Sequence, residues 1–198
     1  IDLNATLGLD GAQTKQTIKA FIEDLYTIST ETLIGIVAYN DKVRTLGLRT
    51  FEEQDEVYQF IDGLSTNGTY SGMYESCLRA VDILDGTVFR GAKNLILFTD
   101  EGDETTIGAI LKEEVLKARV ARRVVALDGT LFTEKDHQEM TELAQSPENY
   151  RFVADQTGLA NAFTDLADQM RQTDRFVFER PGDFVDRPRL IRFTFSLR

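Results

Sequence analysis

The chain has 198 residues, of which 42% are hydrophobic and 28% are charged, a balance typical of a folded globular domain with one main core. Its formal net charge of −11 would repel a phosphate backbone, which argues against nucleic acid as a partner. No apolar run reaches the length of a membrane span, so direct membrane insertion is not expected.

The first half of the chain predicts helices around one strand hairpin. Apolar side chains at helical spacing predict a helix over residues 13–28. The branched apolar run at 32–40 predicts a buried strand, and the alternating segment after it predicts an antiparallel hairpin over 33–48. Helical spacing returns at 57–64, and a further helix is expected to begin near residue 71.

The second half alternates strands with helices. In chain order we expect a strand at 94–99, a helix at 105–118, a strand at 123–127, a helix at 134–144, a short strand at 150–154 and a last helix at 159–170. This alternation predicts an α/β fold of three layers, with a doubly wound, mostly parallel, Rossmann-like sheet and one antiparallel edge strand from the hairpin. Ligands of such folds bind at the carboxyl ends of the strands.

The end of the chain has a different pattern. Residues 174–198 alternate apolar and polar side chains around a Pro-Gly turn, which predicts a β-hairpin. We therefore expect one domain over 1–173, followed over 174–198 by a β extension or the start of a second module. The chain opens without a Met, and Ile1 alone represents the central strand, so we expect a longer polypeptide with the first strand mostly upstream.

Two side-chain types common in catalysis occur once each. Cys77 lies on an apolar helical face, which predicts a buried small side chain rather than a nucleophile. His137 lies in a polar run, expected on an exposed helix, without a recognisable catalytic setting. We therefore predict no catalytic residues and expect that the protein is not an enzyme.

Oxygen-bearing side chains occupy alternate positions at the start of the chain. Asp2, Asn4 and Thr6 would all point to one side of an extended backbone and converge on one hard cation. The same residues would also fit a solvated turn. The same spacing could instead begin at Asp10, in "DGAQT". That choice leaves too few residues before the apolar face of the first predicted helix, and the middle residue of the pattern is then neither Ser nor Thr, so we prefer Asp2.

Two further loops expected at the same edge of the sheet add oxygen ligands. Thr69 lies in the loop "STNGTYSG", and Asp100 lies in "TDEGDE" directly after the strand at 94–99. Asp103 is a weaker candidate that also fits a cap for the helix expected near residue 105. An all-oxygen set suits Mg²⁺, with Mn²⁺ or Ca²⁺ as alternatives.

These residues make the sequence resemble the von Willebrand factor A (vWA) domain family over roughly residues 1–173. That family carries a metal-ion-dependent adhesion site (MIDAS) with the pattern Asp-x-Ser-x-Ser after the first strand, a Thr in a second loop and an Asp in a third. "DLNAT" has this spacing, with Asn4 and Thr6 in the serine places, while "TNGTYSG" and "LILFTDEGDE" resemble the other two loops. Asn4 places a longer carboxamide where the family has a hydroxyl, so the resemblance implies a variant site.

The resemblance implies a non-enzymatic adhesion module that binds a protein partner through the cation, whose open position accepts an Asp or Glu carboxylate. The implied ligands are Asp2, Asn4, Thr6, Thr69 and Asp100, with Asp103 in their surroundings. The tail resembles the β-rich continuation after vWA domains in some bacterial exported proteins, which favours an extracellular or cell-surface setting, although vWA domains also occur inside cells. The alternatives are a scaffolding vWA module with a degenerate site and, less favoured, a metal-dependent hydrolase.

Overall fold

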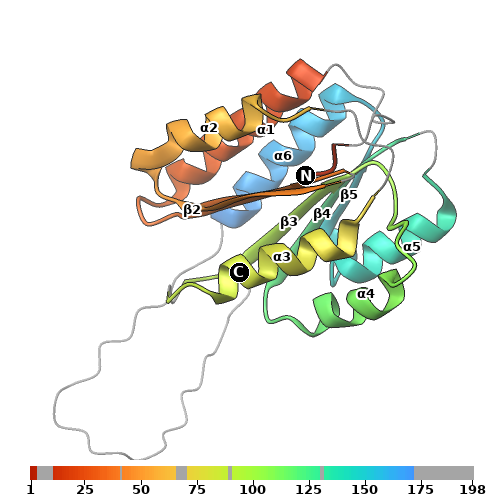
Figure 1. Cartoon of the computed structure of the whole chain (residues 1–198). Coiled ribbons are helices and arrows are strands. Elements are labelled where there is room, and N and C mark those ends of the chain that lie inside the picture. The colour runs from red at the N-terminus through yellow and green to blue at the C-terminus, as the bar shows by residue number, and fades with distance from the viewer. Residues whose placement is uncertain (4–10, 41, 66–70, 89–90, 130–131, 172–198) are drawn as a thin grey trace, which may run out of the picture.

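Helices cover both faces of a sheet in this protein, whose structure is a computed structural model that describes residues 1–3, 11–40, 42–65, 71–88, 91–129 and 132–171 (Figure 1). The elements are α1 (Gly11–Ile28), β1 (Ile34–Tyr39), β2 (Val43–Arg49), α2 (Gln54–Asp62), α3 (Met73–Asp85), β3 (Asn94–Thr99), α4 (Gly108–Lys117), β4 (Ala121–Leu127), α5 (Glu134–Leu143), β5 (Tyr150–Val153) and α6 (Gln156–Arg171), with short 3-10 helices at Phe51–Glu53 and Pro147–Asn149. Each helix and strand expected between residues 13 and 170 is therefore present.

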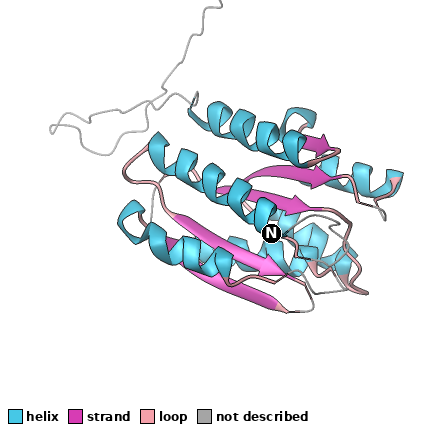
Figure 2. Ribbon diagram, turned by 90° about the horizontal axis from the view of Figure 1, so that it is seen from above, coloured by secondary structure: helices cyan, strands magenta, loops and turns pink. Residues whose placement is uncertain are grey.

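The sheet is parallel except for the hairpin at one edge. β1 and β2 pair antiparallel, while β3, β4 and β5 pair parallel in that order. Residues 1–3 lie between the two groups: Asp2 forms a parallel bridge with Tyr39, and its N–H donates to the carbonyl oxygen of Phe98 at 2.8 Å. The strands consequently follow one another as one twisted sheet (Figure 2), and the predicted α/β fold with its antiparallel edge strand is confirmed.

Each face of the sheet has its own apolar core. α1, α2 and α6 cover one face, and α3, α4 and α5 cover the other (Figure 1). On the first face the ring of Phe163 stacks on Phe21 with centroids 4.6 Å apart and meets Phe98 edge-on at 5.8 Å. These contacts join α1 and α6 over β3. They stabilise the fold because burying large aromatic side chains contributes a large favourable free energy.

A buried arginine closes the amino end of β4. Arg122 is 4% exposed, and its guanidinium donates to the carbonyl oxygens of Leu143 at 2.9 Å, Val115 at 3.0 Å and Ala118 at 3.2 Å. These carbonyls lie at the C-terminal ends of α4 and α5, where helix carbonyl oxygens carry partial negative charge. Burial lowers the pKa of Arg122. Its charge thus joins two helix ends to the sheet.

Some expectations fall outside the part of the chain that the structure describes. The β extension at 174–198 and the domain boundary near residue 173 are among them, so both stay predictions. Within the described ranges, no helix combines the length and the apolar character that crossing a membrane would require.

Candidate metal-binding edge

Two of the predicted ligands from opposite parts of the sequence lie at one edge of the sheet. Residues 1–3 run parallel to β1 and β3, with the N–H of Leu3 donating to the carbonyl oxygen of Tyr39 at 2.9 Å. Asp2 therefore lies beside the carboxyl ends of β1 and β3, and Asp100 directly follows β3. Because parallel strands end at a common edge, the fold places Asp2 and Asp100 at the same edge of the sheet. Their role as metal ligands stays a prediction.

Thr99 links the first segment to the Asp100 loop. Its hydroxyl oxygen lies 2.9 Å from Oδ2 of Asp2 and 2.7 Å from the carbonyl oxygen of Glu101, and it accepts the N–H of Glu101 at 3.3 Å. Thr99 is fully buried, so water does not compete for these hydrogen bonds. The Asp2 carboxylate is thereby held against the backbone that carries Asp100.

A buried phenol lies beside both carboxylates. Tyr39 is 1% exposed, and its pKa is raised well above the usual value, first by burial and then by the negative charge of Asp2, with a smaller effect from Asp100. The phenol therefore stays neutral and supplies a polar wall without adding a third negative charge. Tyr39 was not among the residues predicted for the site; in the sequence it shows only as a polar group near the end of the strand expected at 32–40.

The buried acids of the described residues gather at this edge alone. They are Asp2 at 0%, Asp100 at 1% and Glu101 at 4% exposure. Removing a carboxylate from water is costly unless hydrogen bonds, an opposite charge or a metal ion offsets the loss, and for Asp2 the Thr99 hydroxyl at 2.9 Å supplies one such hydrogen bond. Glu101, next to Asp100, was not among the residues selected from the sequence.

Three of the five predicted ligands, Asn4, Thr6 and Thr69, lie outside the described residues. Within the described ranges, no three His, Cys, Asp or Glu side chains are grouped in a way that would hold a metal ion. The oxygen donors that are described, Asp2 and Asp100, fit a hard cation such as Mg²⁺ by their chemistry. The complete ligand set stays a prediction.

The loop that contains Thr69 ends against the Asp100 loop. Ser71, two residues after Thr69, is fully buried; its N–H donates to Oε2 of Glu104 at 3.2 Å, and its carbonyl oxygen accepts the N–H of Glu104 at 3.0 Å. This pair of hydrogen bonds fixes Ser71, which precedes α3, against Glu104. Ser71, near the end of the second predicted loop, is thus a neighbour of the third predicted loop.

Asp103 holds a helix end. Its Oδ2 accepts the N–H of Tyr74 in the first turn of α3 at 2.8 Å, and its Oδ1 accepts the N–H of Thr105 at 2.9 Å and also the Thr105 hydroxyl. The cap expected for a helix near residue 105 is therefore not what Asp103 provides: α4 begins only at Gly108 with Ile107 at its N-cap, and the helix that Asp103 bonds to is α3. A carboxylate at a helix N-terminus satisfies a free N–H and interacts favourably with the helix dipole. Any influence of Asp103 on a bound cation stays a prediction.

Gly129 supports the Asp100 backbone from the neighbouring loop after β4. A Cβ at this position would lie 2.5 Å from the carbonyl oxygen of Asp100 and 3.3 Å from its Cβ. No side chain fits there unless one of the two segments moves. A glycine two residues beyond a buried strand is the sequence signal for such a close approach.

The residues set aside as non-catalytic have structural surroundings. Cys77 is 2% exposed in the core between α3 and the sheet, as predicted, and burial raises the pKa of its thiol to about 12. The expectation of an exposed setting for His137 was wrong: it is half-buried, its Nδ1 lies 2.7 Å from the hydroxyl of Tyr150, and its ring meets Phe132 and Phe152 edge-on. Because the residues around His137 are polar, the sequence did not predict that this side of α5 contacts β5.

A family model for the von Willebrand factor type A domain matches residues 8–169. The chain belongs to this family. The match begins after Asp2, Asn4 and Thr6, so it establishes the family without including the first part of the variant metal motif. No curated protein sequence gives a significant match to this vWA chain.

Several solved structures share the fold at low sequence identity. The pilus adhesin SpaC from Lactobacillus rhamnosus GG aligns with a TM-score of 0.70 at 10% identity, over 86% of this chain and 30% of that one. The von Willebrand factor type A protein from Catenulispora acidiphila gives 0.66 at 17%, over 84% and 40%. Proximal thread matrix protein 1 from the mussel byssus, with a zinc-occupied MIDAS motif, gives 0.66 at 16%, over 86% and 44%. This chain therefore spans less than half the length of each of these neighbours.

Proposed function

We propose that this vWA domain binds a protein partner through a divalent cation held at the carboxyl edge of its sheet. The observation that carries the proposal is that Asp2 and Asp100, 98 positions apart in the sequence, are both buried at this edge, with the Asp2 carboxylate 2.9 Å from the hydroxyl of Thr99, the residue before Asp100. Asn4, Thr6 and Thr69 complete the proposed ligand set. Mg²⁺ is the preferred ion, with Mn²⁺ or Ca²⁺ as alternatives, because every donor is an oxygen.

In this proposal the domain holds the cation in place, and the partner supplies the last ligand of that cation. The cation provides an open coordination position for an Asp or Glu carboxylate of the partner. The Thr99 hydroxyl lies 2.9 Å from Asp2, Gly129 leaves room for the Asp100 backbone, and the buried phenol of Tyr39 packs beneath the same edge. Low water access strengthens each charge interaction at such an edge. The function is binding, and no residue is assigned to catalysis.

We place the domain outside the cell or on its surface, as part of a longer polypeptide, with a vWA domain over 1–173 and a β extension over 174–198. Support comes from the fold neighbours, among which a pilus adhesin and a byssus protein with a metal-occupied MIDAS occur. The alternative is a scaffolding vWA module whose site is degenerate, which Asn4 in a serine place favours.

Thermal unfolding of the full chain with Mg²⁺ or Mn²⁺, compared with chelator, tests the proposal. A ligand present at about one hundred times its Kd stabilises the native state by about 2.7 kcal/mol. For a domain of this size this raises the Tm by roughly 5–11 °C, at roughly 2–4 °C per kcal/mol. The increase should disappear in Asp100→Asn and persist in Asp165→Asn, which removes an equal charge from an exposed position of α6.

The readout is the increment that the metal produces, since neutralising a buried carboxylate changes the Tm of the metal-free protein by itself. An increment that survives Asp100→Asn, or no increment in the parent chain, would favour the scaffolding alternative. Capture of a partner that is lost with chelator and restored with Mg²⁺ would separate adhesion from metal binding alone.

A further inference from the structure

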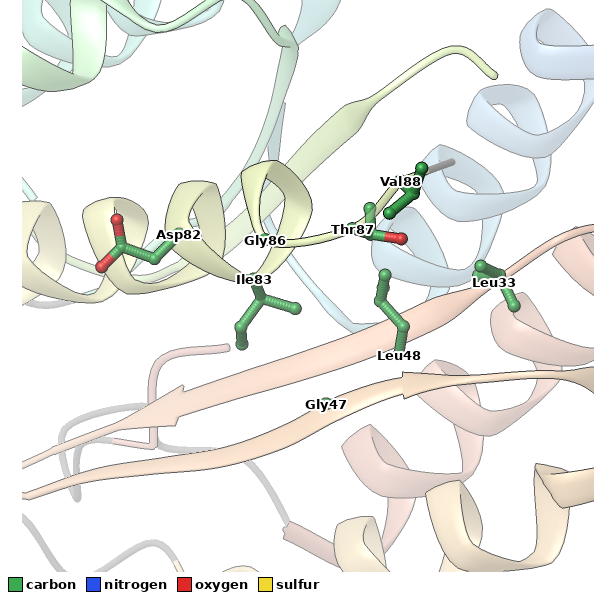
Figure 3. Close-up of a pocket in the computed structure, with 8 residues that line it drawn as sticks. All are labelled: Leu33, Gly47, Leu48, Asp82, Ile83, Gly86, Thr87 and Val88. Carbon is green, nitrogen blue, oxygen red and sulfur yellow. The ribbon is translucent and has the colours of Figure 1, made fainter. Parts of the chain in front are cut away.

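An apolar groove lies at the pole of the domain opposite to the metal-binding edge. It occupies about 690 Å³ between the β1–β2 hairpin and the end of α3, and is lined by Leu33, Gly47, Leu48, Asp82, Ile83, Gly86, Thr87 and Val88 (Figure 3). α3 ends at Asp85 and leaves this part of the hairpin face uncovered, while Gly47 offers no side chain to fill it. Val88 at its rim is 92% exposed, more than any other large hydrophobic side chain that the structure describes.

The strand beside the groove has an open edge. Within the described part of the chain, β2 pairs only with β1, so the hydrogen-bonding groups along its outer side point away from the sheet. An unpaired edge next to exposed apolar side chains is the surface onto which an additional strand docks most readily. The groove and the edge together would accept a strand with one apolar face.

The chain leaves the described domain at the same pole. α6 ends at Arg171, whose guanidinium lies 3.2 Å from Oδ1 of Asp24 and 3.1 Å from the Thr27 hydroxyl, near the end of α1. Leu33 of the groove follows Thr27 by six residues and precedes β1. The eighteen residues between Arg171 and residue 190 span up to about 60 Å when extended. This exceeds the width of the sheet, roughly 25 Å for five strands with residues 1–3 between them.

The segment at 190–197, "LIRFTFSL", has the pattern that this surface requires. Ile191, Phe193, Phe195 and Leu197 alternate with other residues, so an extended backbone places all four on one face. Residues 172–198 contain six arginines and four acids, whereas the whole chain carries a net charge of −11. A net positive segment is therefore attracted to a strongly negative body, and Asp82 supplies an acid at the groove itself.

We propose that residues 190–197 of this same chain add to the outer edge of β2 and place Phe193 and Phe195 over the apolar groove. The interaction would cover the open edge of the sheet and fasten whatever follows the vWA domain to the pole away from the partner. It is independent of metal binding at the opposite edge, so the two proposals fail or succeed separately.

Amide hydrogen exchange of the full chain tests this proposal. The parent is compared with Phe193→Asp/Phe195→Asp, and with the control Thr194→Asp/Ser196→Asp, which adds the same two charges to the other face of the segment. The outward amides of β2 should exchange at least about tenfold faster in the phenylalanine variant than in the parent and control, since local opening governs their protection. Exchange of β3 and β4 should be equal in all three, which shows that the domain remains folded.

Equal exchange of β2 in the three proteins would overturn the proposal, and so would outward β2 amides that are unprotected in the parent. Protection that falls when the protein is diluted about a hundredfold would overturn it as well, because it would assign the groove to a second copy of the chain. Protection that is independent of dilution and lost only in the phenylalanine variant supports the contact within one chain.

Discussion

The substitution Gly129→Ala tests whether the loop after β4 positions Asp100. The added Cβ would lie 2.5 Å from the Asp100 carbonyl oxygen, and carbon–oxygen contacts normally begin near ~3.3 Å, so one segment must move by about 0.8 Å. Overpacking of this kind costs about 1–3 kcal/mol. The expected Tm is lower than that of the parent by roughly 2–12 °C. Because Asp100 itself is displaced, the increment that Mg²⁺ adds to the Tm should also shrink.

Gly63→Ala is the matched control for this change. Gly63 has φ −76° and ψ −1°, which alanine adopts without strain, and its added Cβ would meet no atom closer than 3.4 Å. Alanine restricts the unfolded chain at such a site, so this variant should equal the parent or gain up to about 1 kcal/mol. Scanning calorimetry with Mg²⁺ and with chelator measures both effects. A Gly129→Ala protein that unfolds at the parent temperature and keeps the full metal increment would refute the positioning role.

Three further substitutions test the packing of the domain. Phe163→Ala removes a ring stacked at 4.6 Å on Phe21 and should cost about 3–5 kcal/mol in urea unfolding, whereas Phe51→Ala, at a half-exposed ring, should cost far less. Burial raises the pKa of the Cys77 thiol from 9.0 to about 12, so stability present below pH 9 falls by about 1.4 kcal/mol per pH unit towards pH 12, and Cys77→Ala should flatten that part of a urea-midpoint profile. Arg122→Met leaves the carbonyls at the ends of α4 and α5 without their donor and should cost at least about 1–3 kcal/mol; a neutral result would contradict the capping role.

The sequence was sufficient to predict the order and type of the elements. The strand expected at 94–99 is β3 residue for residue, and the helix expected at 13–28 is α1 with two more residues at its start. These signals are local, because the periodicity of apolar side chains reports which face of an element is buried. The vWA resemblance drawn from the three loops was confirmed by the family match, while the variant motif at Asn4 and Thr6 stays a prediction.

The sequence indicated which loops hold the candidate ligands, but it did not predict the contacts that these loops make with one another. That Asp2 and Asp100 share an edge follows from strand order, and a resemblance could suggest it. That Thr99 bonds to Asp2 depends on the register between segments 97 residues apart, which no local pattern encodes. The same holds for Gly129 beside Asp100, since the fit of two loops is decided by how the strands beneath them pack.

By itself, the amino-acid sequence determined that this chain forms an α/β domain with acidic and hydroxyl-bearing loops at one end, because helix and strand periods and loop composition are properties of neighbouring residues. Only the tertiary structure decided that Glu101 is buried, that Tyr39 pairs with Asp2, and that Asp103 is bonded to the start of α3. These placements result from packing between distant segments, where burial and hydrogen bonding must be satisfied at the same time.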